Sequence, residues 1–104
     1  MTARIKTKRL TTMALTNNDI QKALRIKRAV NEYFENSNDT KVQAKELMNL
    51  FIGKGIFTSN NQDGLPIRDF LRLLDENKQL NLIPQVFFEQ KEKNKNWYFI
   101  KTKI

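Results

Sequence analysis

The spacing of apolar positions changes along this 104-residue chain, and the change predicts the fold class. From residue 16 to about residue 77 the apolar residues recur with the period of one face of an α-helix. From residue 85 to residue 102 they become aromatic and β-branched runs, which favour strands. The pattern therefore predicts an α+β domain, with three helices followed by a β-hairpin.

The first predicted helix begins after Thr16 and ends in the polar segment 36–39. Thr16 can accept a hydrogen bond from the backbone N–H of Asp19, whose carboxylate suits the positive end of the helix dipole. Leu15 and Ile20 stand at the two positions of a hydrophobic staple. The apolar stripe expected to face the core consists of Ile20, Ala23, Leu24, Ile26, Val30, Tyr33 and Phe34.

The segment that begins at Thr40 allows two interpretations. Thr40 and Gln43 have the spacing of a capping box, which would start a second helix at once. Alternatively, the chain runs extended through 41–43 and the helix begins near Ala44. In both cases the dense apolar residues of 47–52 should be buried, and Gly53 should end the helix as its C′ residue.

A polar loop over 58–64 separates this helix from a third one. Pro66 stands where proline is favoured, in the first turn, and the third helix should extend to about residue 77. Residues 85–90 and 96–102 then form the two strands of a hairpin whose tip is rich in lysine. Because an isolated hairpin is marginally stable in water, we expect it to pack on the helices.

The chain contains neither cysteine nor histidine, which excludes disulfides, zinc fingers, thiol nucleophiles and imidazole acid–base catalysis. The remaining reactive residue types form no nucleophile–base pattern, and residues 53–55 lack the setting of a phosphate-binding loop. We therefore expect no enzyme activity, no metal site, no cofactor and no small-molecule substrate. No apolar run approaches the length of about 18 residues that a membrane span needs, and no signal-peptide core follows the N-terminus. A cytoplasmic protein without membrane contact is the expectation.

The net charge of +8 is concentrated at the two ends of the chain. Residues 1–31 hold eight basic and one acidic residue, and residues 78–104 hold six lysines and two glutamates. Residues 32–77 are slightly acidic, with five basic and eight acidic residues. Such an excess favours polyanions, because each Lys or Arg placed on a phosphate releases a counterion. A surface charged only for solubility is the alternative.

Two groups of basic residues near the N-terminus are candidates for contact with a polyanion. We expect residues 1–14 to form a flexible basic arm and residues 15–104 to form the single domain. The candidates are Lys6, Lys8 and Arg9 in the arm, and Lys22, Arg25 and Arg28 along one ridge of the first helix.

Three helices followed by a hairpin with a basic tip resemble a winged helix-turn-helix DNA-binding domain. The segments that carry the resemblance are AKELMNLF (44–51), GLPIRDFLRLLDENKQLNLIP (64–84) and VFFEQKEKNKNWYFIKT (86–102). The resemblance is a pattern of elements at superfamily level, and it covers residues 16–102. It implies that the third helix enters the major groove, while the hairpin and the arm contact phosphates or the minor groove.

Applied to this chain, the resemblance implies that Arg68 and Arg72, one turn apart on the third helix, read base edges. The residues implied to contact the DNA backbone from the hairpin are Lys91, Lys93, Asn94 and Lys95. The alternative for the two arginines is a set of surface ion pairs, since the same helix exposes acidic residues. The pairs would be Arg68 with Glu76, and Arg72 with Asp75 or Glu76.

The sequence thus predicts a non-catalytic domain that binds nucleic acid, with duplex DNA as the expected partner. Its role would be that of a small transcriptional regulator or a mobile-element accessory factor, and a homodimer would enlarge the surface buried on DNA. One alternative is a winged-helix protein–protein interaction module that does not read DNA, with Trp97 or Tyr98 as an anchor. Another is RNA binding through exposed aromatic side chains.

Overall fold

The computed structural model describes residues 15–60 and 62–102, and in these residues the predicted α+β class is confirmed. The basic arm and its candidates Lys6, Lys8 and Arg9 lie outside the described residues. The helices and strands, in chain order, are α1 (Asn17–Glu35), β2 (Lys41–Gln43), α2 (Met48–Gly53), α3 (Leu65–Glu76), β3 (Val86–Gln90) and β4 (Lys95–Ile100). Short 3-10 helices η1 (Ala44–Leu47) and η2 (Leu80–Leu82) precede α2 and follow α3.

Helix α1 begins where the sequence predicts. The Thr16 hydroxyl accepts from the Asp19 N–H at 3.1 Å, and the Asp19 carboxylate accepts from the Thr16 N–H at 3.0 Å, which completes a capping box. The residues of α1 that are buried in the core are Ala23, Ile26, Ala29, Val30 and Phe34. Leu24, expected in the core, is 36% exposed, because it stands about 100° around the helix from Ala23 and falls at the edge of the buried stripe.

The extended interpretation of residues 41–43 is the correct one, because this segment is strand β2 and pairs antiparallel with β4. Val42 is buried opposite Phe99, so a long-range pairing overrides the local capping-box signal at Thr40. The prediction for Gly53 is wrong: it is the last residue of α2, and Gly55 is the C′ residue with φ +76°. The N–H of Ile56 donates to the Phe51 carbonyl at 2.8 Å, which closes a Schellman motif.

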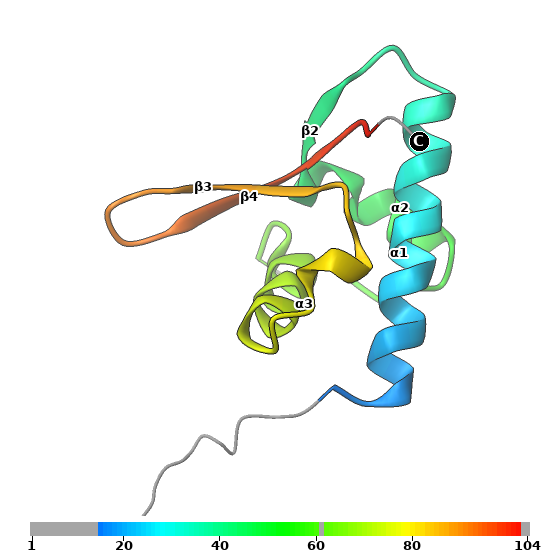
Figure 1. Cartoon of the computed structure of the whole chain (residues 1–104). Coiled ribbons are helices and arrows are strands. Elements are labelled where there is room, and N and C mark those ends of the chain that lie inside the picture. Colours follow the sequence, from blue (N-terminus) through cyan, green and yellow to red (C-terminus); the bar gives the residue numbers. More distant parts are fainter. Residues whose placement is uncertain (1–14, 61, 103–104) are drawn as a thin grey trace, which may run out of the picture.

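The sheet has the strand order β2-β4-β3, and all of its pairs are antiparallel. Val42, Trp97 and Phe99 of one face are buried against the helices, and the rings of Phe99 and Phe51 meet edge to face with centroids 6.0 Å apart. Since β2 pairs only with residues 98–100, the far part of the hairpin extends beyond the body of the domain, above α3 (Figure 1).

Buried Gln85 fixes the entry into β3. Its amide nitrogen donates to the Lys27 carbonyl at 3.3 Å and to the Asn31 side chain, both on α1. The base of the hairpin is therefore tied to α1, while its tip stands free of that helix on the opposite side of the molecule (Figure 1). None of the helices in the described ranges has the length and apolar character to cross a membrane.

Candidate nucleic-acid interface

A polar groove of about 820 Å³ lies between α3, the hairpin and the segment around η1. The residues that line it are Gln43, Lys45, Gln62, Asp63, Arg68, Arg72, Asp75, Glu76, Gln90, Lys93, Asn94, Lys95, Asn96, Trp97 and Tyr98. Five of these side chains are basic and three are acidic, which leaves a modest positive excess. A mostly polar groove with a positive excess suits a hydrated anionic ligand better than an apolar one.

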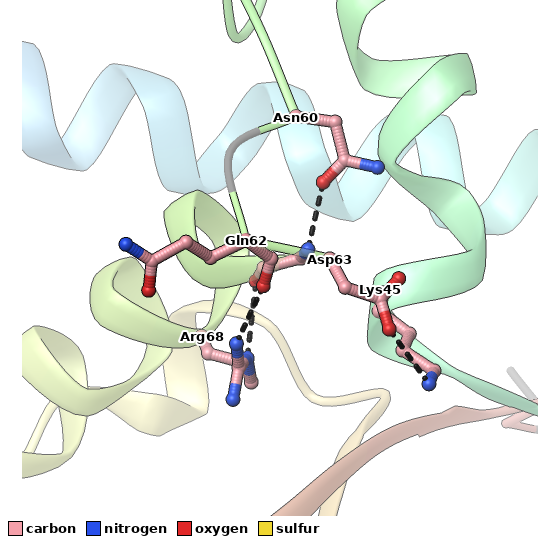
Figure 2. A network of polar contacts seen from close by, with 6 residues as sticks. Lys45, Asn60, Gln62, Asp63 and Arg68 are labelled. Atoms are coloured by element: carbon pink, nitrogen blue, oxygen red, sulfur yellow. Dashed lines mark hydrogen bonds and ion pairs between the residues drawn. The ribbon is translucent and has the colours of Figure 1, made fainter.

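Arg68 supports the loop before α3. Its Nη2 donates to the Gln62 carbonyl at 3.0 Å, and its Nε lies 3.3 Å from the Gly64 carbonyl (Figure 2). The side chain is half-buried, and both contacts engage the guanidinium with main-chain oxygens of the same loop. Arg68 therefore lines the groove, with two of its five N–H donors engaged by the carbonyls of this loop.

The loop that Arg68 holds is strained. Gln62 and Asp63 have φ near +50°, in the left-handed region that costs a residue with a Cβ about 1 kcal/mol or more. The strain is offset by side-chain contacts: Asn60 Oδ1 accepts from the Gly64 N–H at 2.7 Å, and Lys45 Nζ lies 3.1 Å from Asp63 (Figure 2). These contacts fix the start of α3 against η1.

Arg72 is the exposed arginine of α3. Its Nη1 lies 2.9 Å from Asp69 Oδ1, and both side chains are more than half exposed. The ion pair is thus formed with Asp69 and not with Asp75 or Glu76. Exposed pairs of this kind contribute about 0–1 kcal/mol, so the guanidinium can leave Asp69 for a ligand at little cost.

Lys95 connects the hairpin to α3. Its Nζ lies 2.5 Å from Asp75 Oδ2, with each side chain about one-third exposed. The same ammonium lies over the rings of Phe88 and Trp97, at 4.6 Å and 5.6 Å from their centroids. Lys95 therefore sets the position of the hairpin above α3, a structural role that the sequence did not indicate.

We expect a double-mutant cycle on Lys95 and Asp75 to give a coupling free energy of about 1 kcal/mol in urea denaturation. K95M, D75N and the double variant would be compared with wild type. The more exposed pair Arg72–Asp69 is the matched control, with an expected coupling of about 0.3 kcal/mol. A coupling for Lys95–Asp75 no larger than that of the control would contradict the role given to Lys95.

The other hairpin candidates lie at the tip. The Lys91 N–H donates to the Asn94 carbonyl at 2.7 Å and closes the loop, and the Lys91 ammonium is 4.0 Å from Glu89. Lys93 and Asn94 are exposed at the end of the groove. Lys93 makes no ion pair with any residue in the described part of the chain, so its charge is available.

The basic ridge of α1 does not reach the groove. Lys22 lies over the rings of Phe57 and Phe70, and Arg25 Nη2 donates to the Lys54 carbonyl at 2.7 Å. Arg28 is exposed near Glu32, whose pKa is lowered mainly by its 2.7 Å contact with Lys54 and to a lesser degree by Arg28. Helix α1 lies across the molecule from the hairpin tip (Figure 1), and none of these three residues lines the groove.

Lys45, Gln62 and Asp63 are among the groove residues that were not predicted from the sequence. They reach the groove because β2 joins the sheet and draws η1 beside α3. The polar composition of 58–64 was visible, but no local signal linked Lys45 to that loop.

No family model, curated protein or solved structure gives a significant match to this chain.

Proposed function

We propose that this chain is a non-catalytic duplex-DNA-binding domain that uses α3 and the hairpin tip together, in the manner of a winged helix. The observation that carries the proposal is the groove between these two elements, with Arg72 and Lys93 on its exposed margin. The strand order β2-β4-β3, with the three helices placed before the hairpin, is compatible with a winged-helix arrangement.

The proposed roles follow from the contacts each side chain already makes. Arg72 is the candidate for reading a base edge, because a weak surface pair is all that holds it. Lys93 and Asn94 contact phosphates from the tip. Arg68 and Lys95 act as positioning residues, the first through the loop before α3 and the second through the hairpin.

The proposal is tested by fluorescence anisotropy with labelled duplex DNA at several salt concentrations. Wild type should bind, and log K should fall linearly with log salt as counterions are released. K93Q should reduce that slope by about 1, and R72A should weaken binding to a selected preferred site by about 1–3 kcal/mol. The control is R28A, which also removes one positive charge but from α1, across the molecule from the hairpin tip (Figure 1). We expect it to leave the salt dependence and the affinity nearly unchanged.

Absence of wild-type binding to any duplex at moderate salt would exclude this function. An effect of R28A as large as that of K93Q would move the interface to α1.

A second candidate function is protein binding through the same groove, favoured by its acidic residues Asp63, Asp75 and Glu76. Carboxylates repel phosphates, whereas a protein partner with mixed charge could pair with both signs. A stoichiometric protein partner that is recovered after nuclease treatment, and is lost with E76K, would favour this candidate over DNA binding.

A further inference from the structure

Strand β3 has one edge with which no described strand pairs. It is the terminal strand in the order β2-β4-β3, and among residues 15–60 and 62–102 its only strand partner is β4. Phe87 and Phe88 on this strand are 39% and 37% exposed. Edge strands usually carry lysine or proline against pairing with other chains, and Val86–Gln90 contains neither. This edge is therefore open to a further strand.

The hydrogen bonds at the two ends of β3 show which peptide groups face outward. The Gln85 carbonyl accepts from the Ile100 N–H at 2.8 Å, and the Lys91 N–H donates to the Asn94 carbonyl at 2.7 Å, so both residues face β4. Peptide groups alternate along a strand, so Phe87 and Glu89 also face β4. The outward-facing residues are therefore Val86, Phe88 and Gln90.

Most of the outward groups are unbonded within the described residues. The Val86 N–H donates to the Ile83 carbonyl at 3.0 Å, but the Val86 carbonyl accepts no hydrogen bond from the described residues. Both main-chain groups of Phe88 and of Gln90 likewise lack a partner in the described residues. The edge thus offers two donors and three acceptors, in an order that limits how another strand can pair.

We propose that β3 pairs antiparallel with β3 of a second copy of this chain, about a two-fold axis at Phe88. In this register the two Phe88 residues exchange a pair of N–H···O bonds. Each Gln90 N–H then donates to the Val86 carbonyl of the other copy. The four hydrogen bonds use only unbonded groups and leave the Val86 N–H with Ile83. A register shifted by one residue would need the groups of Phe87 and Glu89, which already face β4.

The side chains agree with this register. Phe88 pairs with Trp97, so it lies on the sheet face that turns toward α3, and the two-fold axis places it beside its symmetry mate. Two partly exposed aromatic rings thereby cover each other. Because this axis is perpendicular to the sheet, both α3 helices lie on the same side of a continuous six-stranded sheet.

The pairing is inferred from the strand edge alone and does not rest on the proposed DNA binding. If DNA binding also holds, the dimer presents both α3–hairpin surfaces in the same direction, toward two half-sites of one duplex.

The absence of native cysteine makes the register testable by single thiols. Residues of a hydrogen-bonded antiparallel pair have Cα atoms about 5.5 Å apart, within the disulfide range of about 4.4–6.8 Å. F88C should therefore form a covalent dimer under mild oxidation. F87C is the control with the same exposure: its two thiols would be offset by two residues, with Cα atoms about 8 Å apart. We expect F88C to cross-link about tenfold faster than F87C on non-reducing gels.

Sedimentation equilibrium in DNA-free buffer gives a second, thiol-independent measurement. Wild type and F87K should show a monomer–dimer equilibrium, whereas F88K should be monomeric because two like charges would meet on the axis. Circular dichroism would verify that F88K remains folded. Equal cross-linking of the two cysteine variants, or a wild type that stays monomeric at millimolar concentration, would overturn the proposal. Unchanged self-association of F88K would overturn it as well.

Discussion

Gly64→Ala is expected to destabilise the domain by about 3 kcal/mol, because two costs coincide at this residue. Gly64 has φ +94°, a conformation that residues with a Cβ rarely adopt. A Cβ at this position would also lie 2.4 Å from Lys45 Cβ and 3.0 Å from Lys45 Cα. Lys45 Cα belongs to the main chain and Lys45 Cβ is bonded directly to it, so neither atom can move away through a change of rotamer. Urea denaturation followed by circular dichroism measures the loss.

The steric contact with Lys45 also predicts which neighbouring parts of the structure are disturbed. To relieve the contact, the start of α3 must move away from η1, which disturbs the loop carbonyls that Arg68 holds. Gly53→Ala is the control, since nothing lies within 4 Å of a Cβ there and the residue is helical. That change should stabilise the fold by about 0.5–1 kcal/mol. Equal effects at the two glycines would contradict the close packing of the loop on η1.

Phe99→Ala is expected to lower the free energy of unfolding by about 3–5 kcal/mol, because it empties a fully buried site in the centre of the sheet. Phe99 is fully buried on the central strand, paired with Val42 on one side and Val86 on the other. Its ring meets Phe51 of α2 edge to face, so it connects the sheet to the helices. A domain of this size is stable by about 5–15 kcal/mol, and the change removes a large share of that.

Phe87→Ala is the matched truncation of the same residue type in the same sheet. Phe87 is 39% exposed and packs its ring on Tyr98 across the hairpin, so its loss should cost about 1 kcal/mol or less. Thermal and guanidinium denaturation would compare the two variants. A cost for Phe87→Ala as large as that for Phe99→Ala would mean that the outer face of the sheet is covered in solution.

The sequence alone determined those elements whose signals are local. Thr16 and Asp19 lie three residues apart and cap α1 by themselves, so the helix begins where its residues predict. Pro66 and the apolar stripe of α3 act within one helix, and the hairpin strands follow from residue types that favour strands. The α+β class and most element positions could be derived in this way.

The tertiary structure decided what depends on residues far apart in the chain. Residues 41–43 carry a helix-start signal at Thr40, yet pairing with β4 makes them a strand. Arg68 and Arg72 look equivalent on one helix face. In the structure Arg68 donates to carbonyls of the loop before α3, whereas Arg72 makes an exposed ion pair with Asp69. Lys93 and Lys95 look equivalent on the hairpin, but Asp75 lies within reach of Lys95.

In each of these pairs the side chains have similar chemistry, and what separates them is the partner that the fold brings near. A local pattern fixes which face a side chain occupies, because helix and strand periods are properties of the backbone. It cannot fix which distant group meets that face, because this depends on the path of the connecting loops. For this protein the sequence therefore determined most of the elements and the sign of the charge at each end. Only the tertiary structure separated the basic residues that hold the fold from those that face solvent at the groove.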